Sequence, residues 1–197
     1  MPISVKLKQL KLVSGAKTLS IFDNLYSDIL TIPYSSESDL MNELWSRKPP
    51  LSKSLNGNVF EGILATILYR SNILPIYTQA KIAYVPNVNF DFVVFSREFG
   101  PINLSAKTSL RERYKQADLE GMLLRQVHRK SKSFLITIDS KEAKILNKKI
   151  EGGSVYGLDQ AIVAVDKEFD KLITHLKTLN YYKPEKVDVL TSSKVIT

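Results

Sequence analysis

The clearest pattern of hydrophobic and polar positions begins near residue 58. Apolar residues recur at helical spacing from Asn58, a plausible helix N-cap, to about Tyr69. Three runs rich in β-branched and aromatic residues follow, with short turns between them: Ile76–Val85, Phe90–Ser96 and Ile102–Lys107. Successive strands joined by tight turns predict an antiparallel three-strand meander.

Helical and strand-like segments alternate after the meander. The pattern predicts a long helix from about Leu110 to Val127 and an amphipathic helix over Phe169–Leu179, with strands at Ser133–Ile138 and Gln160–Val165. This order is typical of an α/β fold. We therefore expect a central mixed β-sheet that contains the antiparallel meander and is flanked by helices.

The first 50 residues give weaker signals. Ile3–Val13 alternates apolar and polar positions and fits either a strand or a short helix, whereas Asp39–Arg47 has helical spacing and ends before two prolines. The polar stretch from Ser52 to Asn58 predicts a loop. A length of 197 residues fits one domain, which we divide into an N-terminal region (1–55), a core (56–180) and a tail (181–197).

Composition excludes several kinds of chemistry. The chain has no cysteine and two histidines, which excludes cysteine-based zinc sites, thiol nucleophiles and redox motifs. The longest stretch without a charged residue, Ser71–Ala80, is far shorter than the roughly 20 apolar residues of a membrane helix. Lys6, Lys8 and Lys11 interrupt any signal-peptide core. We expect a cytoplasmic protein with no membrane partner.

Positive charge is concentrated in one part of the chain. Lysine and arginine number 28 against 20 acidic residues, and the window Ser105–Phe134 alone carries 8 basic and 3 acidic side chains. Such a local excess is typical of proteins that bind a phosphate backbone. A solvated helix face, on which Arg111, Glu112, Arg113 and Lys115 form surface ion pairs, would give the same pattern.

Asp91 is the most unusual polar residue of the meander. It lies in a strand between apolar neighbours, where a carboxylate is costly unless a lysine or a metal ion pairs with it. Antiparallel pairing of the second and third strands brings Asp91 opposite the region of Lys107. Ser105 and Lys107 are two residues apart and share one face of the sheet. A buried ion pair with a purely structural role is the simpler alternative.

Asp91 followed by Ser105-Ala106-Lys107, in a helix–strand–strand–strand–helix–strand context, resembles the PD-(D/E)xK nuclease superfamily, which includes type II restriction endonucleases. The resemblance covers roughly residues 58–138. It implies that Asp91 binds a divalent metal and that Lys107 orients or helps to deprotonate the attacking water. Two departures are Phe90, where the family has proline, and Ser105, where it usually has a second acidic residue.

A subgroup of that superfamily also has serine at this position, and a glutamate on the following helix replaces the lost carboxylate. Glu120 stands at the matching distance from Lys107, with 12 residues between them. Gln116 precedes Glu120 by four residues and shares its helix face. Glu61 matches the helical acidic residue that many members place beside the metal. A solvated Glu120, paired with Lys115 or Arg125, is the alternative for that position.

These matches imply a Mg²⁺-dependent, site-specific endonuclease of double-stranded DNA. Asp91, Glu120 and Glu61 offer the hard oxygen ligands that Mg²⁺ prefers, and Ser105 and Lys107 complete the expected catalytic set. Enzymes of this type usually act as symmetric dimers, although a heterodimer with a specificity subunit is also conceivable. The alternatives are a junction-resolving or repair nuclease of the same superfamily, and a non-catalytic DNA-binding protein.

Residues that follow the catalytic lysine are candidates for DNA contacts. Arg111, Arg113 and Lys115 could bind phosphates near the scissile bond. Thr108 and Ser109 could do the same, or could cap the helix. We expect no nucleotide cofactor, because the glycine pair at 152–153 is not followed by the Lys-Thr of a phosphate-binding loop.

Overall fold

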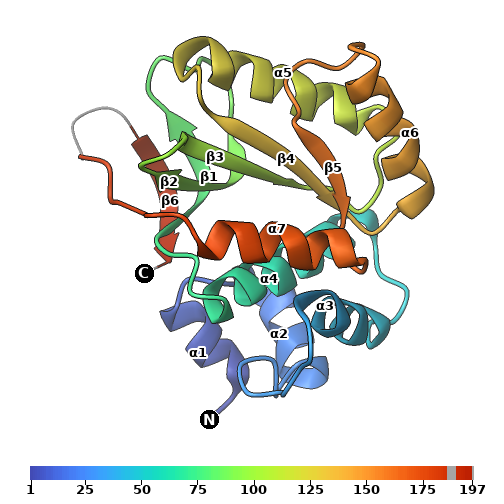
Figure 1. Ribbon diagram of the computed structural model, residues 1–197. Helices are drawn as coiled ribbons and strands as arrows, with labels where there is room; N and C mark the ends of the chain where they lie inside the picture. The colour runs from blue at the N-terminus through green and yellow to red at the C-terminus, as the bar shows by residue number, and fades with distance from the viewer. Residues whose placement is uncertain (186–189, 197) are drawn as a thin grey trace.

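A six-stranded sheet forms the centre of the computed structural model, which describes residues 1–185 and 190–196 (Figure 1). The strands are β1 (Ile76–Ile82), β2 (Phe90–Ser96), β3 (Gly100–Ala106), β4 (Lys132–Thr137), β5 (Gln160–Val163) and β6 (Leu190–Ile196). The helices are α1 (Ile3–Gln9), α2 (Ala16–Leu25), α3 (Glu37–Ser46), α4 (Lys53–Arg70), α5 (Arg113–Val127), α6 (Ser140–Glu151) and α7 (Lys167–Lys177).

The strand order is β5-β4-β3-β2-β1-β6. β2 pairs antiparallel with β1 on one side and with β3 on the other, which confirms the predicted meander. β3, β4 and β5 run parallel, so the sheet is mixed, as expected for the predicted fold class. β6, which comes from the predicted tail, pairs antiparallel with the other edge of β1.

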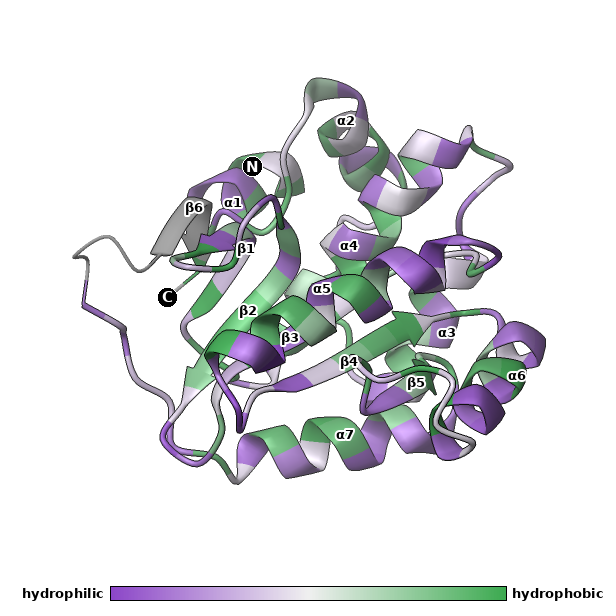
Figure 2. Cartoon of the chain, turned by 90° about the horizontal axis from the view of Figure 1, so that it is seen from above, coloured by the Kyte–Doolittle hydropathy of each residue, from purple (hydrophilic) through white to green (hydrophobic). Residues whose placement is uncertain are grey.

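Helices cover both faces of this sheet (Figure 1). The face that carries Phe92, Val94 and Leu104 packs against α4 and α7, and we call it the α4 face. The opposite face, which we call the α5 face, carries Val93 and Leu135 and packs beneath α5. Figure 2 shows hydrophobic residues running along β2, whereas α7 carries hydrophobic and hydrophilic residues in alternation. A strand of this kind is buried on both sides.

Helix α4 begins earlier than the sequence pattern indicates. The predicted loop over Ser52–Asn58 is wrong, because the helix starts at Lys53 and its N-cap is Ser52, whose Oγ accepts a hydrogen bond from the Leu55 N–H. Asn58 is therefore not the cap. The first turns of α4 are exposed or half-buried and its fully buried residues begin at Val59. The hydrophobic pattern thus begins about one and a half turns after the first residue of the helix.

The N-terminal helices pack onto α4. Residues 3–9 are helical, which settles the choice that the sequence left open. α2, which the sequence pattern does not predict, packs so closely on α4 that a Cβ on Gly62 would lie 2.7 Å from the Phe22 ring. These contacts join the N-terminal region to the same hydrophobic cluster as the α4 face of the sheet. Over the described residues, the helices are too short or too polar to cross a bilayer.

Candidate active site

The candidate site lies where β2 and β3 separate. Their ladder runs from Ser96↔Gly100 to Phe92↔Leu104 and stops there, one residue before Asp91. The Ala106 N–H donates to Asp91 Oδ2 at 2.9 Å, so the carboxylate replaces the backbone acceptor that the ladder no longer provides. Asp91 is thereby fixed at the open end of the strand pair.

Lys107 pairs with Asp91 as the sequence predicts. Lys107 Nζ lies 2.7 Å from Asp91 Oδ2, and both side chains are almost buried. Ser105 Oγ, at 3.5 Å, lies at the limit of hydrogen bonding to the same oxygen. Three donors therefore converge on Oδ2, whereas Oδ1 accepts no hydrogen bond from any described residue. One Asp91 oxygen holds the site together and the other is available to a ligand.

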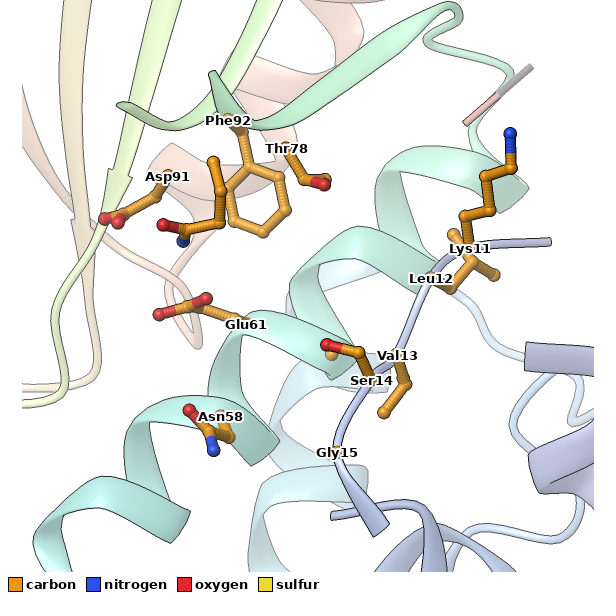
Figure 3. Close-up of a pocket in the computed structure, with 12 residues that line it drawn as sticks. Lys11, Leu12, Val13, Ser14, Gly15, Asn58, Glu61, Thr78, Asp91 and Phe92 are labelled. Carbon is orange, nitrogen blue, oxygen red and sulfur yellow. The ribbon is translucent and has the colours of Figure 1, made fainter. Parts of the chain in front are cut away.

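Glu61 faces this pair from α4. Figure 3 shows its side chain extending from the helix toward the strand that bears Asp91. Burial raises the pKa of Glu61 from its ordinary value of 4.5 to about 7, and the negative charge of Asp91 adds to this effect while Lys107 opposes it. Two carboxylates thus share one positive charge from Lys107.

Glu120 approaches the same pair from α5. It is only 7% exposed, and its Oε1 accepts a hydrogen bond from Gln116 Nε2 at 2.8 Å. Burial raises the pKa of Glu120, as does the charge of Asp91, while Gln116 and Lys107 act in the opposite direction. The alternative interpretation, in which Glu120 is a solvated helix residue paired with Lys115 or Arg125, is therefore wrong.

The two cations proposed for that alternative pairing have other partners. Lys115 pairs with Glu112 on the helix surface. Arg125 binds the Asp159 carboxylate at 2.8 Å and the Tyr156 carbonyl at 2.7 Å. Glu120 is therefore free to face Asp91 and Lys107 rather than solvent.

The donor set fits a hard divalent cation. The negative charge of Asp91 acts on both Glu61 and Glu120, and burial also disfavours the charged form of these two carboxylates. A bound cation would favour the charged form of both. In the part of the chain that the structure describes, no group of three acidic or histidine residues is close enough to enclose a metal by itself. Mg²⁺ commonly takes one or two carboxylates and completes its shell with water and substrate phosphates.

A pocket of about 230 Å³ opens beside Asp91 and Glu61 (Figure 3). Its other walls are residues that the sequence analysis did not select: the segment Lys11–Gly15, Asn58, Thr78 and Gln79. These residues come from three separated parts of the chain, and neither motif nor spacing links them to Asp91. The structure alone brings them together.

The predicted DNA-contacting residues lie between β3 and the first turns of α5. The Leu110 and Arg111 N–H groups donate to Glu142 Oε2 at 2.6 and 3.1 Å, which fixes the β3–α5 loop onto α6. Arg111, Arg113 and Lys115 are exposed. Their DNA contacts, and those of Thr108 and Ser109, remain predictions.

The interpretation of Thr108 and Ser109 as helix caps is wrong. α5 begins only at Arg113, its N-cap position is Glu112, and no side chain of the described residues caps it. The Thr108 and Ser109 side chains are therefore too far before the helix to bind its first N–H groups.

The basic residues of the 105–134 window form two groups at opposite ends of α5. One group follows Lys107. The other, Arg125, Arg129, Lys130 and Lys132, lines a shallow depression beyond the helix C-terminus together with Asp159. Along α5, Lys115 of the first group and Arg125 of the second are separated by about 15 Å. Only the first group directly follows Lys107, the residue that pairs with Asp91.

A solved structure shares this architecture. The chain superposes on a restriction endonuclease, PspGI, solved in complex with its substrate DNA, with a TM-score of 0.52 and 15% sequence identity. The match covers 90% of this chain and 83% of the other. No family model and no curated protein sequence matches. The chain therefore has a restriction-endonuclease-like fold.

Proposed function

We propose that this chain is a Mg²⁺-dependent, site-specific endonuclease of double-stranded DNA, similar to type II restriction enzymes. One observation carries the proposal. Four residues from separate segments of the chain converge where β2 and β3 separate: Asp91 in β2, Lys107 directly after β3, Glu61 in α4 and Glu120 in α5. A structural Asp–Lys ion pair needs neither of the two extra carboxylates, the buried Glu120 and the half-buried Glu61, whose raised pKa values make them costly to the apo protein.

Each residue of the site has a role that its surroundings support. Asp91 Oδ1, Glu120 and Glu61 would hold Mg²⁺, directly or through its bound waters. When bound, the ion would stabilise negative charge on the phosphate and favour hydroxide over water at neutral pH. Lys107 Nζ is held 2.7 Å from Asp91, where it can orient the attacking water. Gln116 fixes the Glu120 carboxylate, and the Ala106 N–H fixes that of Asp91.

The same proposal accounts for the charged loop after β3. Arg111 and Arg113 extend into solvent directly after the catalytic strand, where their charge can meet phosphates next to the scissile bond. Glu142 holds the loop backbone in place, so these side chains start from a fixed position. One site of this kind cuts one strand, and we therefore expect a symmetric dimer to cut both.

The test is cleavage of a long, sequence-diverse linear DNA in Mg²⁺ and in EDTA, alongside a four-way junction of the same composition. Discrete fragments from the linear DNA that require Mg²⁺ would support the proposal. Cleavage of the junction alone would replace it with a junction-resolving activity. Metal-independent binding without cleavage would replace it with a DNA-binding role.

A further inference from the structure

Strand β1 carries a local break that the fold itself does not need. β1 pairs with β2 and with β6 through Tyr77, Thr78 and Ala80, but both ladders omit Gln79. Gln79 has φ +48°, in the left-handed region that non-glycine residues rarely adopt. A strained residue in the interior of a strand persists only where its surroundings enforce it, and such residues cluster at functional sites.

The break is directly opposite Asp91. The pairs Thr78↔Phe92 and Ala80↔Phe90 flank it, so Gln79 and Asp91 occupy the same level of the sheet. The alternation of faces shifts on both strands at this level. In a regular strand, residues three positions apart point to opposite faces of the sheet. Tyr77 and Ala80 nevertheless belong to the same hydrophobic cluster, and so do Phe90 and Val93.

The Gln79 side chain lines the pocket that contains Asp91 and Glu61. The Asn89 amide donates a hydrogen bond to Gln79 Oε1 at 2.7 Å, which orients the terminal amide. The Nε2 group makes no hydrogen bond with the described part of the chain. A neutral donor is therefore held in the pocket that contains the Asp91 and Glu61 carboxylates.

We propose that Gln79 contacts the substrate, donating a hydrogen bond from Nε2 to a non-bridging oxygen of the phosphate that is cleaved. The inference rests on the proposed nuclease function. Asp91 and Glu61 repel a phosphate, and Lys107 is already paired with Asp91. Gln79 offers an uncharged donor from β1, and its left-handed backbone breaks the regular alternation of side chains at this level.

The test compares Gln79→Gly and Gln79→Glu with the wild type in single-turnover cleavage with the enzyme in excess. Glycine relieves the left-handed backbone and removes the donor, so we expect an unchanged or higher melting temperature and a cleavage rate about 10- to 100-fold lower. Glutamate keeps the length of the side chain but replaces the donor with a negative charge, and we expect at least the same loss. Asn87→Gly is the matched control, because Asn87 is an exposed turn residue with φ +59° that does not line the pocket.

The two proposals fail in different ways. If the wild type cuts DNA and both Gln79 variants cut at its rate, the role of Gln79 is overturned and the nuclease function stands. If the Asn87→Gly control slows cleavage as much as Gln79→Gly, the effect is not specific to the pocket and the role is again overturned. If the wild type cuts no DNA with Mg²⁺, the nuclease function fails and the role of Gln79 fails with it.

Discussion

Glu61 provides the sharpest link between the geometry of the site and a measurable property. Its pKa of about 7 in the folded protein exceeds its ordinary value of 4.5, because burial and Asp91 both disfavour the charged form. The native state therefore holds this proton more tightly than the unfolded state does. Stability from this group is full below pH 4.5, falls as pH rises toward 7, and stays low above that.

The magnitude follows from the pKa difference. A difference of 2.5 units corresponds to about 3 kcal/mol, which is an upper value because Glu61 is only partly buried. Glu61→Gln removes the charge at every pH. In EDTA at pH 8 we expect this variant to exceed the wild type in stability by up to about 3 kcal/mol, or roughly 6–12 °C in melting temperature for a chain of this size. At pH 5 the difference in melting temperature should shrink to about 2–3 °C.

Thermal unfolding followed by circular dichroism in EDTA, at pH 5 and at pH 8, measures both quantities. Adding Mg²⁺ at pH 8 should raise the melting temperature of the wild type, and should raise that of Glu61→Gln less, because the variant lacks one ligand. Glu151→Gln is the control, since Glu151 is exposed at the end of α6. Equal melting temperatures of wild type and Glu61→Gln at pH 8 in EDTA would refute the reasoning.

Two further predictions concern packing and DNA binding. Gly157→Ala places a Cβ 1.9 Å from the Asp118 carbonyl oxygen and should lower the free energy of unfolding by about 3 kcal/mol or more. Gly57→Ala, with open space around it, should raise the free energy of unfolding by about 0.5–1 kcal/mol. Similar denaturation midpoints for the two variants would contradict this packing. Arg113→Ala should weaken DNA binding and reduce the slope of log affinity against log salt by about 1. Arg129→Ala, beyond the C-terminal end of α5, should change neither quantity. An equal loss of DNA affinity in both variants would show that DNA does not lie preferentially at the Lys107 end.

Local pattern was enough to predict the part of the fold that carries the site. The runs at 76–85, 90–96 and 102–107 became β1, β2 and β3, because alternating β-branched and aromatic residues with tight turns leave few other arrangements. The Asp91–Lys107 contact followed from the register of a hairpin with a short turn. Such features depend on neighbours within about 20 residues of each other.

Other features depend on contacts that local pattern does not record. β6 is separated from its partner β1 by more than 100 residues, so nothing near Leu190 predicts the pairing. α2 has few fully buried residues, and its close approach to α4 is possible only because Gly62 lacks a side chain. The left-handed backbone of Gln79 breaks the local preference of a strand. Its place beside Asp91 is visible only in three dimensions.

The most direct test of the account is Mg²⁺-dependent cleavage by four proteins on the same long duplex: wild type, Lys107→Ala, Asp91→Asn and Glu151→Gln. The account predicts discrete fragments from the wild type and from Glu151→Gln in Mg²⁺, none in EDTA, and no fragments from the other two variants even though they bind DNA. Cleavage by Lys107→Ala or Asp91→Asn at the wild-type rate, or no cleavage by any of the four proteins in Mg²⁺, would contradict it.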